Sequence, residues 1–279
     1  MHKLGSSERP DLPLAVVVGA GALGSAVARR LALSNRVLLA DIDLGAAEGK
    51  AAQMRGDGCD VTAIACDVTS AQDVSALARQ VESAGGLGAL VYVTGLSPSL
   101  GDFRTIMRVN LSGAAQVVDA LLPHALPGAA AVLIASLAAH SLTPSAQAQA
   151  VLREPGGGDL AERLGAVLGD AATPQMAYVH SKYGLLMLAR RQARAWGARG
   201  ARIVSLSPGL IATPQGALEF EKSPGKRRMF DASPLARECT MLEVADVAEF
   251  LTSARASFIS GTDVLVDGGL NAALGETDG

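Results

Sequence analysis

The chain has 279 residues, of which 49% are hydrophobic and 3% aromatic, and a net charge of −3. This length fits one large domain or two small ones, and the slightly acidic balance gives no reason to expect nucleic acid or an anionic membrane as a partner. Cys59, Cys66 and Cys239 lack metal-binding spacing, which favours reduced thiols in a cytoplasmic protein and no metal site.

Short apolar runs predict strands at seven places along the chain. They are residues 14–18, 36–40, 61–65, 89–93, 130–136, 201–207 and 263–267. The stretches between them are rich in Ala, Leu, Arg and Gln, which favour helices. Apolar strands that alternate with helices are typical of βαβ units, so the sequence predicts an α/β fold with a parallel sheet covered on both faces.

Two long uncharged runs, 12–28 and 120–152, could be mistaken for membrane spans. Glycines interrupt the first, and prolines and histidines interrupt the second. Because a spanning helix needs about 20 predominantly apolar residues, we expect no membrane span.

A glycine-rich turn follows the first predicted strand. In VVVGAGALGSAVARRLA, Gly19, Gly21 and Gly24 form G-x-G-x-x-G between a strand and a helix, the context of a dinucleotide-binding turn. Glycines allow the tight turn and let backbone N–H groups approach a pyrophosphate at the helix N-terminus. We therefore expect these glycines, with Ala22 and Leu23, to bind a cofactor.

An acidic residue ends the second predicted strand. Asp41 stands 17 residues after Gly24, where a carboxylate accepts hydrogen bonds from the adenosine ribose hydroxyls and repels a 2′-phosphate. This position favours NAD over NADP and places Ile42 beside the cofactor. The alternative is that Asp41 only caps the next helix, although Asp43 is available for capping.

The segment AYVHSKYG carries a tyrosine and a lysine four residues apart, Tyr178 and Lys182. Positions four apart lie on one face of a helix, and a nearby ammonium lowers the pKa of a phenol because it favours the phenolate. Such a pair can move a proton, or it can be an ordinary surface pair. We expect His180 to be structural or solvent-facing, and Trp196 to be a packing residue.

Three further motifs follow predicted strands or lie near the C-terminus. LIASLAA places Ser136 at the end of the fifth predicted strand, SLSPGLIATP follows the sixth, and ISGTDVLVDGGL lies near the C-terminus. With the glycine turn and the Tyr-x-x-x-Lys pattern, they resemble the short-chain dehydrogenase/reductase family over nearly the whole chain. The resemblance implies a Rossmann-type doubly wound parallel sheet with helices on both faces, in a single domain spanning residues 1–279.

The resemblance also implies an NAD(H)-dependent oxidoreductase that interconverts a secondary alcohol and a ketone. In it Tyr178 is the general acid/base, Lys182 lowers the tyrosine pKa and holds the nicotinamide ribose, and Ser136 binds the reacting oxygen. Asn110, in MRVNLSG, matches an asparagine that relays protons to the lysine through water. The other implied cofactor contacts are Asp67, Val68, Thr94, Gly95, Pro208, Gly209, Ile211 and Thr213.

The chain departs from the family pattern at two places. The family's glycine turn is one residue longer and begins with threonine, where this chain has Val18. Val93 stands in place of the asparagine of Asn-Ala-Gly. Both departures affect the expected geometry around the pyrophosphate and leave the reacting groups in place.

Ser136 and Tyr178 are separated by 42 residues, much more than is usual in the family. This insertion, about 140–173, and ARRQARAWGARGARIVSLSPG resemble the 3α-hydroxysteroid dehydrogenase/carbonyl reductase branch, which implies ketone and secondary-alcohol substrates that include steroids. Apolar spacing on either side of GGG predicts two short helices that form one wall of the substrate pocket and change how subunits associate. The alternative is a disordered surface loop.

A substrate loop is expected at about 209–235, and its basic part, 222–230, is either a solvated loop or a mobile lid for an anionic substrate. The family resemblance further implies a homodimer or homotetramer that acts on a small alcohol or ketone. Two other functions stay open: a non-catalytic NAD-binding sensor, and a dehydratase, isomerase or cyclase that uses the same tyrosine.

Overall fold

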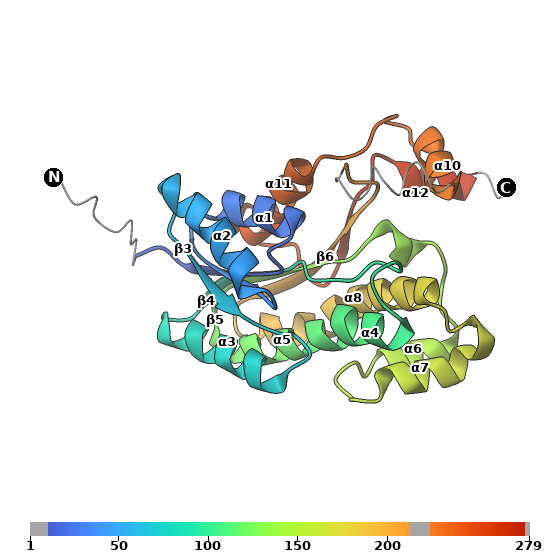
Figure 1. The fold of residues 1–279 in the computed structure, drawn as a ribbon, viewed down its shortest axis with the longest axis horizontal. Helices are drawn as coiled ribbons and strands as arrows, with labels where there is room; N and C mark the ends of the chain where they lie inside the picture. Colours follow the sequence, from blue (N-terminus) through green and yellow to red (C-terminus); the bar gives the residue numbers. More distant parts are fainter. Residues whose placement is uncertain (1–10, 213–223, 277–279) are drawn as a thin grey trace.

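The computed structural model describes residues 11–212 and 224–276. Within them, seven parallel strands form one sheet in the order β3-β2-β1-β4-β5-β6-β7 (Figure 1). The strands are β1 (Leu14–Val18), β2 (Arg36–Asp41), β3 (Val61–Ala65), β4 (Leu87–Tyr92), β5 (Ala125–Ile134), β6 (Arg202–Pro208) and β7 (Asp263–Val266). The predicted α/β fold with a parallel Rossmann-type sheet is confirmed.

Helices cover both faces of this sheet (Figure 1). The upper layer in the figure contains α1 (Ala22–Leu31), α2 (Leu44–Gly56) and α11 (Met241–Thr252). The lower layer contains α3 (Ala71–Ser83), α4 (Phe103–Met107), a π-helical turn η1 (Arg108–Ser112), α5 (Gly113–Leu121) and α8 (Pro174–Gly197). Two buried apolar clusters, one on each side of the sheet, join the strands to these layers.

Shorter helices complete the described chain. The single turns are η2 (Leu122–His124), η3 (Leu137–His140), η4 (Gly169–Ala171) and η5 (Ala254–Ala256). Near the C-terminal end, α10 (Pro224–Ala232) packs against α12 (Leu270–Glu276). No helix among the described residues is both long enough and apolar enough to cross a membrane.

The strand order reverses between β1 and β4. The chain runs outward from β1 through β2 to β3 and then returns to place β4 on the other side of β1. In open parallel sheets, ligands bind outside the carboxyl ends of the strands at such a reversal. The glycine turn after β1 and the segment 93–96 after β4 both lie at this point.

The fifth strand begins earlier and ends earlier than its apolar pattern predicts. Ala125 already pairs with Leu87, and the register then shifts across Pro127 and Gly128, where Gly128 has a positive φ. In the sequence, this proline–glycine pair is typical of a turn. The strand ends at Ile134; the Ala135 N–H still donates to the Leu206 carbonyl at 2.8 Å, and the chain then turns into η3. Ser136 therefore lies two residues beyond the strand rather than at its end.

Helix α8 carries the predicted tyrosine–lysine pair. It begins after the capping residue Thr173, whose hydroxyl accepts from the Met176 N–H, and Pro174 occupies its first turn. Trp196 is completely buried near its end, so its expected packing role is confirmed. His180 is also buried, with Nδ1 at 2.8 Å from the Met176 carbonyl oxygen, and is structural rather than solvent-facing.

The insertion folds into two helices, α6 (Ala146–Leu152) and α7 (Leu160–Leu168), as predicted. Ser145 caps α6, and Leu152, Leu160 and Leu164 are buried. Helix α7 packs against α4 and η1, while α6 packs against α8. Figure 1 shows the pair on the side of α4 and α8 that faces away from the sheet. The alternative of a disordered surface loop is wrong.

Candidate active site

The glycine turn between β1 and α1 is closed by backbone contacts. Gly19 has φ +107°, and a Cβ at Gly24 would lie 1.7 Å from the Gly19 carbonyl oxygen. A Cβ at Gly21 would meet nothing within 4 Å, and Gly21 caps α1 without a side-chain hydrogen bond. The start of α1, with Ala22 and Leu23, thus offers main-chain N–H groups beside open space, which fits a pyrophosphate.

Asp41 ties the end of β2 to this turn. Its Oδ2 accepts from the Ala20 N–H at 2.6 Å, and its Oδ1 accepts from the Asp43 N–H at 2.9 Å. Asp43, not Asp41, caps α2 through the Ala46 N–H, so the capping alternative for Asp41 is wrong. The neighbouring Ile42 side chain is 72% exposed, which is unusual for isoleucine and leaves an apolar surface beside the carboxylate.

The segment after β3 is held by its own side chains. The Asp67 carboxylate accepts from both the N–H and the hydroxyl of Thr69, at 2.8 Å each. Val68 is buried against the lower layer, where a Cβ at Gly113 would lie 2.7 Å from its Cγ2. The main chain of Asp67 is engaged as well, because its N–H donates to Asp73 Oδ2 at 3.0 Å and its carbonyl accepts from the Ser70 N–H at 2.9 Å.

Asn110 links the loop after β4 to helix α8. Its Oδ1 accepts from the Leu96 N–H at 2.7 Å, and its Nδ2 donates to the Leu96 carbonyl at 3.0 Å and to Ser181 Oγ at 3.2 Å. Ser181 in turn donates to the Tyr178 carbonyl at 2.8 Å. The asparagine stands in the π-helical turn η1, a local widening that often marks a functional position.

The amide of Asn110 bonds to main-chain groups outside its own helix. Leu96 belongs to the loop, 14 residues away. The main chain of Leu96 and the side chain of Ser181 are parts of the site that the sequence analysis missed. No residue pattern links positions 14 or 71 residues apart, so only the folded chain reveals them.

Lys182 is buried beneath the same loop. Its side chain donates from Nζ to the Ile134 carbonyl at 2.9 Å, and burial lowers its pKa to about 8. Nζ lies 5.8 Å from the centroid of the Tyr178 ring. A Cβ at Gly95 would lie 3.2 Å from Nζ and 3.4 Å from Asn110 Oδ1, so the absence of a side chain at Gly95 leaves room for both groups.

Ser136 caps the η3 turn. Its Oγ accepts from the Ala138 N–H at 3.2 Å, which leaves the hydroxyl proton available to another acceptor. The turn packs against α8, and Lys182 binds the carbonyl of Ile134, two residues before Ser136. The fold thus gathers Ser136, Tyr178 and Lys182 at the carboxyl end of β5.

The end of β6 approaches β7 closely. Pro208 is the last residue of the strand, and a Cβ at Gly209 would lie 2.8 Å from Asp267 Cα. Ile211 then forms an isolated parallel bridge with Cys239. These three predicted cofactor contacts lie at the same sheet edge as Ser136, whereas Thr213 lies outside the described residues.

Part of the predicted substrate loop is helical. Residues 224–232 form α10, so a solvated loop is the wrong description for this part of the basic segment. Arg227 pairs with Asp231 at 3.1 Å, which offsets one positive charge, and Arg228 is exposed. Lys222 lies outside the described residues.

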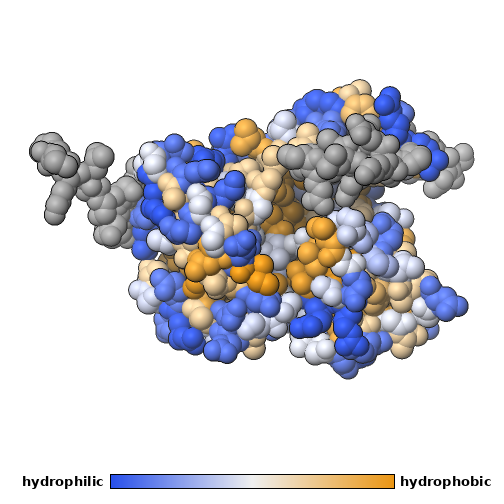
Figure 2. Space-filling model, viewed as in Figure 1, coloured by the Kyte–Doolittle hydropathy of each residue, from blue (hydrophilic) through white to orange (hydrophobic). Residues whose placement is uncertain are grey.

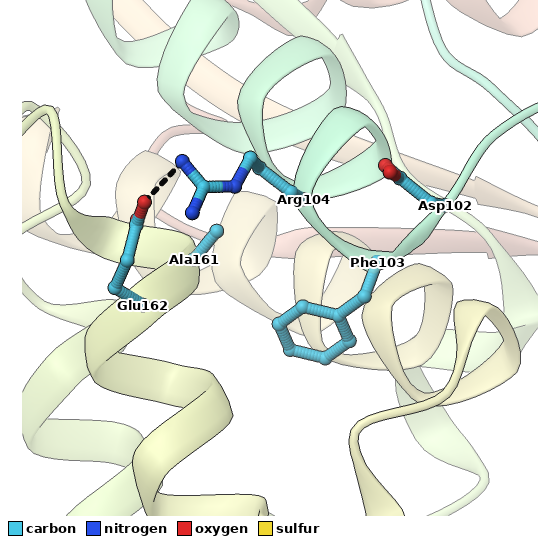
Figure 3. Close-up of a pocket in the computed structure, with 5 residues that line it drawn as sticks. All are labelled: Asp102, Phe103, Arg104, Ala161 and Glu162. Atoms are coloured by element: carbon cyan, nitrogen blue, oxygen red, sulfur yellow. Dashed lines mark ion pairs between the residues drawn. The ribbon is translucent and has the colours of Figure 1, made fainter.

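Apolar side chains gather along a hollow between the two helical layers (Figure 2). A separate pocket of about 270 Å³ lies where the insertion meets α4, lined by Asp102, Phe103, Arg104, Ala161 and Glu162. In Figure 3, Arg104 from α4 reaches across to Glu162 from α7, and the two form an ion pair. None of these five residues is a predicted cofactor or catalytic residue, so this pocket belongs to the junction of the insertion.

A parallel sheet, a glycine turn at its strand reversal and a buried lysine beside a tyrosine define a Rossmann-type protein with a dinucleotide-type turn. The short chain dehydrogenase family model matches residues 13–149, and the enoyl-(acyl carrier protein) reductase model matches residues 164–271. The chain belongs to the short-chain dehydrogenase/reductase family of oxidoreductases, which use a nicotinamide cofactor. The unmatched residues 150–163 lie inside the insertion.

Individual relatives agree with this assignment. The chain is 34% identical over 266 residues to the short-chain dehydrogenase/reductase bsc3 of Alternaria brassicicola, covering 93% of this chain and 96% of the relative. It is 32% identical over 196 residues to the 3-alpha-hydroxysteroid dehydrogenase/carbonyl reductase of Comamonas testosteroni, covering 69% and 76%. The crystal structure of gox2181 superposes with a TM-score of 0.76 at 25% identity, covering 96% of this chain and 98% of that chain.

Proposed function

We propose that the protein is an NAD(H)-dependent oxidoreductase that interconverts a secondary alcohol and a ketone. The observation that carries the proposal is the buried Lys182 ammonium, held between the Ile134 carbonyl and the Tyr178 ring, beside the Ser136 turn. In an ordinary surface tyrosine–lysine pair the lysine stays in solvent, because burying an ammonium costs free energy. Hydroxysteroids and other bulky carbonyl compounds are the first substrates to test.

Tyr178, Ser136 and Lys182 have different roles in the proposed proton transfer. In reduction, Tyr178 donates its phenolic proton to the carbonyl oxygen, and in oxidation it accepts the alcohol proton. The Ser136 hydroxyl donates a hydrogen bond to the same oxygen, where negative charge develops. With a pKa of about 8, Lys182 is mainly an ammonium at pH 7, and its charge favours the Tyr178 phenolate. A bound nicotinamide would supply or accept the hydride.

The experiment that tests this function is a panel of ketones and secondary alcohols, steroidal and aliphatic, followed at the NADH absorbance band. We expect turnover with at least one bulky ketone or its alcohol. Tight NADH binding without turnover across the panel would instead support a non-catalytic sensor.

Coenzyme choice is expected to depend on Asp41. The unmutated protein should prefer NAD(H), and Asp41→Ala should narrow that preference because the carboxylate no longer repels a 2′-phosphate. Since Ala also removes the acceptor of the Ala20 N–H, Asp41→Asn is the matched variant, which removes the charge and keeps one acceptor oxygen.

The measurement for this prediction is kcat/KM with each coenzyme for all three proteins. If charge decides the preference, both variants narrow it. If only Asp41→Ala lost affinity for NAD(H), the result would show that the main role of Asp41 is to support the glycine turn through the Ala20 N–H. Equal or better efficiency with NADP(H) in the unmutated protein would refute the NAD assignment.

The insertion is proposed to shape both the pocket mouth and the subunit contacts of a homodimer or homotetramer. It covers apolar surface on α4 and α8 with Leu152, Leu160 and Leu164. Replacing residues 141–172 with a short linker should leave NADH binding intact, because the insertion packs against α4, η1 and α8, whereas the glycine turn joins β1 to α1. Substrate KM, mass in solution by light scattering, or both should change. Unchanged kinetics together with unchanged mass would show that the insertion has neither role.

A further inference from the structure

A chain of polar side chains connects the Ser136 turn to the edge of the sheet. His140 Nε2 lies 2.9 Å from Asp263 Oδ2, and Ser207 Oγ donates to the other carboxylate oxygen of Asp263 at 3.0 Å. The Asp263 side chain is only 6% exposed. Because an ionised carboxylate only accepts hydrogen bonds, His140 donates through Nε2. The chain joins η3, β7 and β6.

The η3 turn depends on anchors at both of its ends. It is a single 3₁₀ turn, in which the Ala139 N–H bonds to the Ser136 carbonyl and the Ala138 N–H bonds to Ser136 Oγ. Such short turns have weak hydrogen bonds and little stability of their own. The Ala135 N–H fixes the first end through the Leu206 carbonyl. His140 fixes the second end through Asp263.

The position of His140 adds a second reason for an anchor. His140 stands at the start of the insertion, and α6 begins six residues later, behind its cap Ser145. Motion of a long insertion would pass directly into the Ser136 turn unless the chain were fixed between them. The His140–Asp263 contact stands at that boundary, on the edge strand β7, which pairs with β6.

We propose that His140 and Asp263 are positioning residues that hold the Ser136 hydroxyl where it meets the reacting oxygen. This inference rests on the proposed function, because it assigns that role to Ser136. Neither residue takes part in proton transfer to substrate. Their loss displaces the η3 turn, and a displacement of about 1 Å at a reacting group can cost about 10²-fold in rate. The glycine turn and Asp41, at the opposite part of the site, should keep their affinity for NADH.

The test uses two variants of His140 and one control. His140→Ala removes the donor to Asp263, whereas His140→Gln keeps an N–H donor on a side chain of similar length. Val81→Ala, fully buried in α3, is the control for a general loss of stability. Hydrogen exchange of the peptide 135–145 measures the anchor directly, and kcat, KM and the NADH Kd measure its effect on the reaction.

In His140→Ala we expect faster exchange in peptide 135–145, a fall in kcat of about tenfold to a hundredfold, and an unchanged NADH Kd. His140→Gln should restore most of the rate and the protection. Val81→Ala should change neither exchange in this peptide nor kcat at temperatures where it is folded.

Four results would overturn the proposal. Unchanged exchange in His140→Ala would show that the contact is no anchor. Faster exchange with an unchanged kcat would show that the anchor does not position Ser136. Parallel losses in His140→Ala and Val81→Ala would show a general effect of stability. An unmutated protein without turnover would refute the proposed function and the positioning role with it, while the exchange data would still decide whether the anchor exists.

Discussion

Replacing Tyr178 with Phe should abolish turnover and leave NADH binding nearly intact. The phenol hydroxyl is the group proposed to exchange a proton with the substrate oxygen, and losing general acid/base catalysis costs about 10²–10⁴-fold in rate. The phenylalanine ring keeps the packing against the apolar cluster of the lower layer. Single-turnover and steady-state rates at the NADH absorbance band, with NADH binding followed by fluorescence, provide the measurement.

Tyr183 offers a matched control on the same helix. It is a partly buried tyrosine that packs against the same apolar cluster, five residues along α8 and outside the proposed site. Tyr183→Phe should retain activity close to that of the unmutated protein. If Tyr178→Phe kept more than about a tenth of the activity, its proposed role as acid/base would be wrong.

Replacing Lys182 should impair both coenzyme binding and turnover, because this residue is proposed to hold the nicotinamide ribose and to lower the Tyr178 pKa. Lys182→Ala removes the side chain, whereas Lys182→Met fills most of its volume without the charge. Both variants should lose activity. The methionine variant should also be more stable than the unmutated protein in the absence of coenzyme, because the buried ammonium of Lys182 is expensive to desolvate.

The buried ammonium of Lys182 should also make the stability of the folded protein depend on pH. Burial lowers the folded-state pKa of Lys182 from 10.5 to about 8, so the unfolded chain binds the proton more tightly. The stability of the unmutated protein relative to Lys182→Met should therefore rise by about 1–2 kcal/mol between pH 8 and about 9.5. The comparison is needed because burial raises the pKa of the Cys66 thiol to about 11, and this thiol lowers the stability of both proteins in the same range. Measurements should stop there, because burial also raises the pKa of Tyr92 and that phenol destabilises the folded state at higher pH.

Urea unfolding at several pH values checks both statements. An equal change of stability with pH in the two proteins would mean that Lys182 is solvated and contributes nothing to the pH dependence. A methionine variant that kept its turnover would contradict the proposed role of the ammonium.

Much of the architecture could be predicted because it depends on local patterns. Apolar runs locate all seven strands, and the spacing on either side of GGG locates α6 and α7. Strand ends were less predictable: β5 includes Pro127 and Gly128, which belong to turns by their intrinsic preference but here accommodate a register shift against β4.

In the candidate site too, residues in short motifs could be predicted, whereas contacts between distant residues could not. Gly19, Tyr178 and Lys182 belong to short motifs that are visible in one stretch of sequence. The contacts of Asn110 with Leu96 and of His140 with Asp263 join residues 14 and 123 positions apart. Such pairs depend on how the loops meet at the sheet edge, and polar residues that bond to main-chain groups leave no periodic signal.

The hydrogen bond from the Ala20 N–H to Asp41 has a consequence for changing the coenzyme by design. In this chain the side chain that would discriminate against a 2′-phosphate also helps to shape the turn that would receive the pyrophosphate. A single charge-reversing substitution at Asp41 would therefore admit the phosphate and loosen the turn at once. A variant that carries a positive charge at position 41 should therefore need a second substitution that supplies a new acceptor for the Ala20 N–H.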